Sequence, residues 1–112
     1  MALAYRYSAV LERVVDADTI RARLDLGFYV SVTITIRVRG VDTPELHAKA
    51  SETRAAALTA KKRTEELLMG KPFTVESFKD AQSFARWVCD VWLTDGSNLA
   101  DVLITEGLGV AA

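Results

Sequence analysis

Hydrophobic and polar residues alternate most regularly in the run VSVTITIRV at residues 30–38, where every second residue is Val or Ile. Side chains of a β-strand point alternately to its two faces, so this run predicts a strand with one buried and one solvated face. Residues 5–15, rich in aromatic and β-branched side chains, and the alternating residues 19–26 predict two earlier strands. The cluster DADT at residues 16–19 predicts the turn between these two. The first third of the chain is therefore expected to form three consecutive strands.

A helix is expected after Pro44, where the alternation ends. Residues 51–70 are rich in Ala, Leu, Glu, Lys and Arg, which favour helices. Ser51 is the expected N-cap, and Gly70, followed by Pro72, is the expected end of the helix.

The rest of the chain predicts two more strands and a short helix. Residues 72–78 and 86–93 have the composition of strands, and the polar residues 79–83 between them predict a loop. Asn98 is the expected cap of a short closing helix that ends at Gly107.

This order of elements predicts an α+β chain dominated by β-structure. Five strands, a helix between the third and fourth strands, and a short C-terminal helix match the OB-fold, a small Greek-key barrel. We expect one domain over residues 1–112. In an OB-fold the loops after strands 1 and 4 border the ligand-binding face. Asp16, Asp18 and Arg86 are therefore expected to lie near one another.

Composition narrows the class of protein. Half of the residues are hydrophobic and 26% are charged, which indicates a globular chain and excludes a disordered one. No apolar run approaches the roughly 20 residues that span a bilayer, and the N-terminus lacks the features of a signal peptide. We therefore expect a cytoplasmic protein without a membrane partner. The net charge of −1 gives no general argument for a nucleic-acid partner.

The single cysteine and the single histidine limit the possible chemistry. Cys89 lies in an apolar strand-like run and is expected to be a buried, inert thiol. His47 is expected to be an exposed loop residue, because a zinc site is hard to build with only one histidine.

Three acids and two arginines are candidates for one catalytic site. Asp18, Asp42 and a carbonyl near Thr43 offer the oxygen ligands that calcium prefers, with water completing its shell. Manganese and magnesium remain alternatives. The arginines Arg37 and Arg86 offer fixed donor forks that match a phosphate group. A remaining carboxylate, Glu45, is placed to orient or deprotonate a water, and these parts together favour phosphodiester hydrolysis.

Each of these signals has a simpler interpretation when it is taken alone. DADT also fits an ordinary hairpin turn. Thr43 and Pro44 fit the N-cap and first position of a helix, with Glu45 favoured by the helix dipole. Arg37 and Arg86 also fit solvated positions at the surface of a sheet.

Taken together, three motifs are more specific. RVVDADTI, IRVRGVDTPE and SFARWVCDVWLTDG resemble, in this order, the motifs of the staphylococcal-nuclease-like (thermonuclease) family. That family has a D-G-D-T loop, an R-x-x-x-x-D-T-P-E segment and a Y/F-G-R start to the fifth strand. The resemblance runs from about Arg13 to Gly107. It implies an OB-fold enzyme that hydrolyses DNA and RNA with little sequence preference and leaves 3′-phosphates.

The resemblance also implies a role for each matching residue. Asp18, Asp42 and the Thr43 carbonyl would bind one calcium ion, and Asp16 would support this site without binding the ion directly. Glu45 would position and activate the attacking water. The implied phosphate-binding residues are Arg37 and Arg86.

Two positions depart from the family motifs, and Phe84 matches its motif without the hydroxyl of tyrosine. Ala17 stands where the family has glycine, which requires that Ala17 avoid a left-handed backbone. Ala85 likewise replaces the glycine before Arg86. Phe84 keeps an aromatic ring for contact with nucleic acid but has no hydroxyl.

A local basic patch is expected on the solvated faces of the second and third strands. Arg21, Arg23 and Arg39 join Arg37 there and could follow a nucleic-acid backbone, although arginines also keep a sheet surface soluble. The alternative function is an inactive module of this family that binds single-stranded nucleic acid or a protein partner. Such a module has no chemical need for Glu45, which would repel phosphate.

Overall fold

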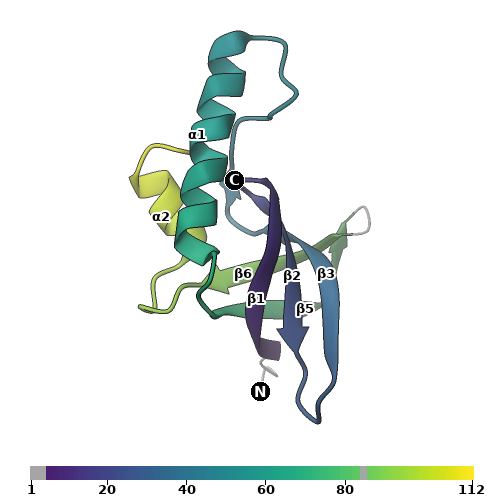
Figure 1. Cartoon of the computed structure of the whole chain (residues 1–112). Helices are drawn as coiled ribbons and strands as arrows, with labels where there is room; N and C mark the ends of the chain where they lie inside the picture. The colour runs from purple at the N-terminus through teal and green to yellow at the C-terminus, as the bar shows by residue number, and fades with distance from the viewer. Residues whose placement is uncertain (1–4, 84–85) are drawn as a thin grey trace.

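Five strands close into a barrel, and two helices pack outside it (Figure 1). The structure is a computed structural model that describes residues 5–83 and 86–112, without the side chains of residues 79–83. The barrel strands are β1 (Tyr5–Asp16), β2 (Thr19–Asp25), β3 (Ser31–Val38), β5 (Phe73–Ser83) and β6 (Arg86–Trp92). Their order around the barrel is β1-β2-β3-β6-β5, and only the β3–β6 pair is parallel.

The OB-fold prediction is confirmed. Helix α1 (Ser51–Leu68) lies between the third and fourth barrel strands in chain order, and α2 (Leu99–Thr105) follows the fifth. Asn98 caps α2 as expected, since its side chain accepts a hydrogen bond from the Asp101 N–H.

The core of the barrel follows the alternation of the second and third strands. Ile20 and Ile36, paired across β2 and β3, are fully buried. For residues 30–38 the prediction of one buried face is wrong at the start of the run, where Val30 and Val32 are exposed. The physical reason is that the β2–β3 hairpin extends beyond the closed part of the barrel, at the end of the molecule opposite α1 (Figure 1).

Helix α1 buries a narrow stripe of mostly small side chains against the barrel. Ala57, Ala60, Thr64 and Leu68 recur at spacings of three and four residues. The predicted N-cap is wrong: Ser51 is already helical, and the capping position is Ala50, whose side chain offers no hydrogen bond. Within the described residues, no helix combines the length and apolar composition needed to cross a membrane.

Gly70 ends α1 as predicted. Its φ of +72° is a left-handed conformation that glycine adopts at little cost. The N–H of the preceding residue, Met69, donates to the Glu65 carbonyl across the last turn.

Strand β5 is longer than predicted. It runs to Ser83, so the loop expected at residues 79–83 is wrong. Antiparallel pairing of Ser83 with Arg86, after an irregular register beyond Ser77, provides backbone partners that override the polar composition. The expectations for Phe84 and Ala85 lie outside the described residues.

A second, very short sheet holds the chain after β3. Strand β4 (Val41–Asp42) pairs with β7 (Val110–Ala111), and Asp42 lies opposite Val110. Gly109 permits this approach, because a Cβ there would lie 2.6 Å from Cγ2 of Val41 and 2.9 Å from the Asp42 carbonyl oxygen. Strands of two residues leave too little pattern to be predicted.

Cys89 is buried on β6, as expected for a structural thiol. Burial, and then the neighbouring charge of Asp90, raises its pKa to about 11. At neutral pH the side chain is therefore a protonated thiol and a poor nucleophile.

Candidate active site

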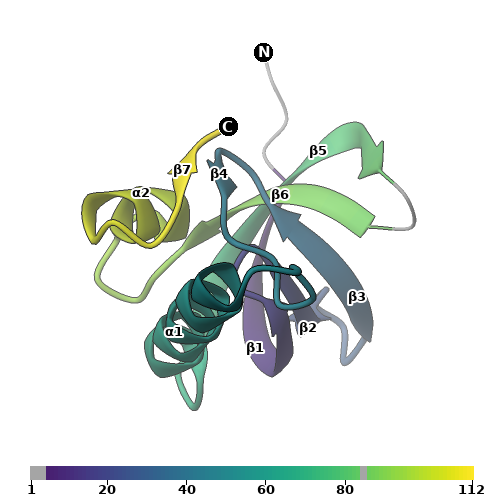
Figure 2. The same cartoon turned by 90° about the horizontal axis from the view of Figure 1, so that it is seen from above.

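One polar hollow of about 460 Å³ collects most of the predicted site residues. The residues that line it belong to the β1–β2 turn, the end of β3, the segment between β4 and α1, and the start of β6. Figure 2 shows how these elements are arranged when the molecule is seen from above. The lining residues of the hollow are Asp16, Asp18, Thr19, Arg37, Asp42, Thr43, Pro44, Glu45, Leu46, His47 and Arg86. Four carboxylates therefore face two guanidinium groups across one space.

Asp18 is the most firmly held acid of this hollow. It occupies the turn between β1 and β2, and its side chain is only 13% exposed. Its carbonyl accepts from the Val38 N–H at 2.8 Å, and its Oδ2 accepts from the Thr43 N–H at 3.0 Å. These bonds tie the turn to the end of β3 and to the segment after β4. The carboxylate is consequently fixed in place before any ligand binds.

The residue before Asp18 is attached to helix α1. Thr64, which is fully buried, donates its hydroxyl to the Ala17 carbonyl at 3.0 Å. Ala17 is itself buried and is not among the described residues with positive φ, so alanine is tolerated where the family has glycine. Sequence reasoning missed Thr64. The only signal was a threonine within a run of strong helix formers.

Thr64→Val is expected to lower the free energy of unfolding by about 2 kcal/mol, because it leaves the buried Ala17 carbonyl without a donor. Urea unfolding measures this change. Thr64→Ser is the matched control, since it keeps the hydroxyl and should retain more of the stability than Thr64→Val. A Thr64→Val variant as stable as the wild type, beside a Thr64→Ser variant that is destabilised, would show that packing of the methyl group, and not the hydrogen bond, matters.

Arg37 joins the acids to the backbone around the hollow. Its Nη1 donates to the carbonyls of Val38 and Val41 at 2.6 and 2.8 Å. Its Nη2 bonds Oδ1 of Asp42 and lies 3.5 Å from Oδ2 of Asp18. The positive charge of Arg37 therefore offsets the negative charges of Asp18 and Asp42, the two acids predicted to be metal ligands. The Arg37 side chain is itself only 19% exposed.

The oxygen atoms that line the hollow are suited to bind a hard cation. The carboxylates of Asp18 and Asp42 converge on the same nitrogen of Arg37, which shows that one positive group can contact both. Within the described residues no group of three or more His, Cys, Asp or Glu side chains is arranged to hold a metal. A cation here would depend on two carboxylates, carbonyl oxygens such as that of Thr43, and water, which is a set that suits calcium better than zinc.

Glu45 and Arg86 line the hollow from two different segments of the chain. Glu45 is exposed in the segment between β4 and α1, and Arg86 is half-buried at the start of β6. The helix start considered for Thr43 and Pro44 is wrong, because α1 begins at Ser51. His47 is exposed, as expected, at the edge of the same hollow. Asp16, at the end of β1, also lines it.

The expected basic patch is smaller than the sequence indicates. Arg21 and Arg23 lie on the outer face of β2, but β3 ends at Val38 and Arg39 lies beyond it. The guanidinium of Arg39 donates to both carboxylate oxygens of Asp90, at 3.0 and 3.1 Å, and stacks 4.5 Å over the Phe78 ring. The Arg39 guanidinium is therefore engaged by side chains of β5 and β6. It is separate from the face of the sheet that carries Arg21 and Arg23.

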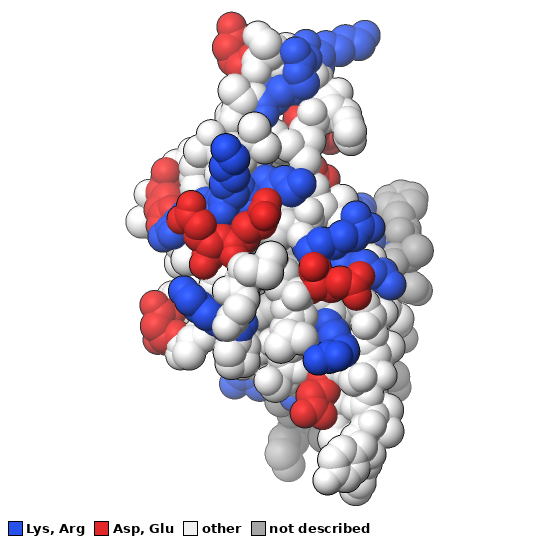
Figure 3. Space-filling view, viewed as in Figure 1, with Lys and Arg blue, Asp and Glu red and all other residues white. Residues whose placement is uncertain are grey.

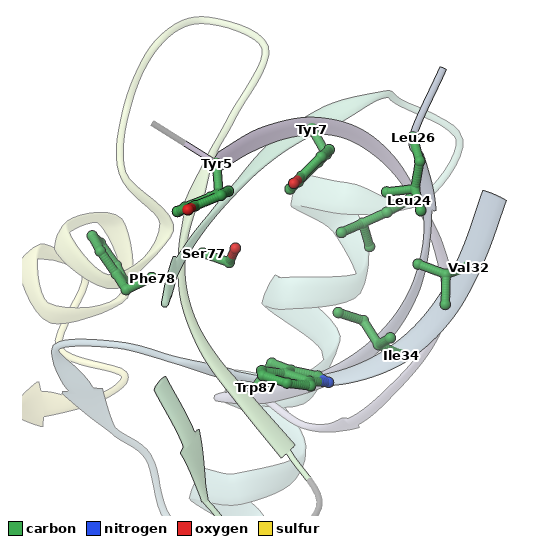
Figure 4. Close-up of a pocket in the computed structure, with 9 residues that line it drawn as sticks. All are labelled: Tyr5, Tyr7, Leu24, Leu26, Val32, Ile34, Ser77, Phe78 and Trp87. Carbon is green, nitrogen blue, oxygen red and sulfur yellow. The ribbon is translucent and has the colours of Figure 1, made fainter. Parts of the chain in front are cut away.

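A second cavity, of about 450 Å³, differs in chemistry from the polar hollow. It opens inside the barrel toward the β2–β3 hairpin, where Tyr7, Leu24, Ile34 and Trp87 surround it (Figure 4). None of the described residues that line it is charged. Trp87 points into this cavity, whereas its neighbour Arg86 lines the polar hollow. The barrel wall thus separates an apolar interior from the charged site.

Comparison with known proteins identifies the family. The family model described as staphylococcal nuclease homologue matches residues 35–112, more than half of the chain. The matched range includes Arg37, residues 42–45 and Arg86. Asp18 lies outside this range, but in the folded chain it lines the same hollow as these residues. No protein with curated annotation matches the chain. The chain belongs to the family of staphylococcal nuclease homologues.

Proposed function

We propose that this protein is a calcium-dependent nuclease that hydrolyses phosphodiester bonds of DNA or RNA with low sequence specificity. One observation carries the proposal: Asp18, Arg37, Asp42, Glu45 and Arg86 come from distant parts of the chain and line one hollow. Family membership supports nuclease chemistry in general. The assignment of individual roles follows the resemblance to the family motifs, and the shared hollow supports it.

Arg37 and Arg86 would bind the scissile phosphate. A guanidinium stays protonated at any physiological pH and offers paired donors that match phosphate oxygens. Arg37 is held by two backbone carbonyls, so its charge is placed before the substrate arrives and requires little reorganisation. Negative charge that develops on the phosphoryl oxygens would be stabilised by both groups.

Glu45 would accept the proton of the attacking water. As the water oxygen forms its bond to phosphorus, the Glu45 carboxylate takes the proton, the bond to the leaving sugar oxygen breaks, and that oxygen takes up a proton from solvent. Asp18, Asp42 and the Thr43 carbonyl would hold the calcium ion. When bound, this ion supplies positive charge to the phosphate and offsets repulsion from the carboxylates.

The test is incubation of the purified protein with single-stranded DNA and with RNA, in calcium and in a chelator. We expect cleavage in calcium and none in the chelator, and parallel reactions with manganese and magnesium identify the working ion. Absence of cleavage with every ion, at high protein concentration, would overturn the proposal. Binding of the same substrates without cleavage would establish the alternative, an inactive nucleic-acid-binding module.

A further inference from the structure

The tip of the β2–β3 hairpin carries two aromatic residues in an unfavourable backbone conformation. Phe28 and Tyr29 have φ of +55° and +58°, and the Val30 N–H donates to the Gly27 carbonyl at 2.9 Å to close the turn. Positive φ at both central residues is the signature of a type I′ turn, which favours Asn and Gly. Bulky aromatic residues are genuine outliers in this region.

The tip also exposes both rings completely. Phe28 retains 97% of its accessible surface, and Tyr29 is fully exposed. In Figure 3 the outermost part of this end of the molecule, which Figure 1 identifies as the β2–β3 hairpin, is uncharged, and an acidic group lies next to it. The chain thus combines backbone strain with exposed apolar surface and gains no internal packing from either. Such a combination points to a contact made with another molecule.

The surroundings of Tyr29 indicate the chemistry of that contact. Tyr29 lines a hollow of about 330 Å³ together with Arg23, Ser31 and Asp25. Asp25 already accepts a hydrogen bond from the Gly27 N–H at 2.8 Å, whereas Arg23 forms no ion pair with any described residue. An aromatic face beside a free guanidinium suits a base and its phosphate.

Arginines and hydroxyl side chains continue this surface toward the candidate active site. Arg23 lies opposite Thr33, and Arg21 lies opposite Thr35, to which it donates at 3.2 Å. On the other side of β2, an irregularity in β1 places Arg13 opposite Arg21. The Nε of Arg21 donates to Oε1 of Glu12 at 3.1 Å, which offsets part of the repulsion between these like charges, and a phosphate contacted by both arginines would offset the rest.

Register shows that the path is continuous. Thr19 and Arg37, which line the polar hollow, form one end of the β2–β3 pairing, and Asp25 and Ser31 form the other. The six residue steps from Thr19 to Asp25 span about 20 Å. A single strand of several nucleotides covers such a distance, within the range of about 4 to 16 nucleotides bound by one OB-fold.

We propose that the outer face of the β2–β3 hairpin is a binding track for single-stranded nucleic acid. Bases stack on Phe28 and Tyr29 at the tip, and phosphates contact Arg23, Arg21 and Arg13 on the way to the polar hollow. The strand is unpaired there, because stacking on protein rings requires bases released from a duplex. The role of the track in delivering substrate to the polar hollow rests on the proposed nuclease function. Binding of nucleic acid to the track does not depend on cleavage.

The double variant Phe28→Asn with Tyr29→Gly tests the track, because it removes both rings and installs the residues that the turn favours. We expect its Tm to rise by about 5 °C as the strain is relieved. Its affinity for a fluorescein-labelled oligothymidylate of about 16 nucleotides, measured in EDTA to prevent cleavage, should fall about 30-fold. Leu58→Ser, which removes an exposed apolar side chain from α1, is the control and should leave this affinity unchanged.

Two further measurements test the charge of the track and its length. Arg23→Gln should weaken binding of the same oligonucleotide and reduce the slope of log affinity against log salt by about one. In calcium, the double variant should lower kcat/KM for the oligonucleotide of about 16 nucleotides and leave that for one of about 4 nucleotides unchanged. If the wild type binds the oligonucleotide but cleaves neither, the nuclease proposal fails and the track stands.

The inference is wrong if the double variant binds the long oligonucleotide as tightly as the wild type does. It is also wrong if the only change is a fall in mass from dimer to monomer in sedimentation, which would assign the tip to contact between two copies of the chain. A loss confined to binding of phosphatidylcholine vesicles would instead assign the tip to a lipid surface and would equally overturn the track.

Discussion

Glu45→Gln is expected to lower the turnover of single-stranded DNA or RNA about a thousandfold in calcium, because the amide cannot accept the proton of the attacking water. Binding should change little, since Glu45 is exposed and the substitution keeps the size of its side chain. Single-turnover cleavage and fluorescence anisotropy measure the two quantities separately.

The matched control for Glu45 is Glu52→Gln. Glu52 is an exposed acid in the first turn of α1 and does not line the polar hollow. Glu52→Gln should retain wild-type turnover. A loss of turnover in this control would show that removing any one negative charge lowers activity. Normal cleavage by Glu45→Gln would contradict the role that we give to Glu45 and would leave the other assignments to be tested on their own.

Arg37→Lys is expected to lower turnover by about 100- to 1,000-fold, although it preserves the positive charge. The guanidinium contacts the Val38 and Val41 carbonyls through one nitrogen and Asp42 through another, and a single ammonium group cannot reproduce this arrangement. We also expect the free energy of unfolding to fall by about 1–2 kcal/mol, because two carbonyls lose a charged donor. Cleavage kinetics and urea unfolding measure these effects.

Arg63→Lys provides the comparison for Arg37. Arg63 donates to both carboxylate oxygens of Glu106 at 2.7 and 2.9 Å on the exposed surface between α1 and α2, away from the hollow. Its substitution also replaces a two-pronged contact but should leave turnover unchanged. Equal losses of turnover in both variants would show that Arg37 acts through the stability of the fold and not through the phosphate.

The candidate site could be predicted to a large extent from short motifs. Asp18, Asp42 and Glu45 belong to short motifs whose residue types suit cation and water chemistry, and the OB-fold order implied that Asp18 lies near Arg86. The positions of Arg37 and Arg86 followed from the same motifs. Their roles remain predictions, which the cleavage and binding measurements decide.

Several features of the site had no local signal. Thr64 contacts Ala17 from 47 positions away in the chain, and nothing around either residue predicts that bond. Asp42 belongs to a strand of two residues whose partner, Val110, lies near the C-terminus. Arg39 has the residue type and spacing of its neighbours, yet its ion pair with Asp90 takes it to another surface.

Local, repeated patterns in the chain were enough to specify the alternating strands of the barrel, the helix that Gly70 ends, and the order that makes an OB-fold. Contacts between distant residues decided where those elements stop and which side chains meet. Strand β5 continues through polar residues because β6 supplies backbone partners. The β2–β3 hairpin exposes Phe28 and Tyr29 because it extends past the barrel that buries Ile20 and Ile36. Pairing and burial depend on residues far apart in the chain, which no local pattern records.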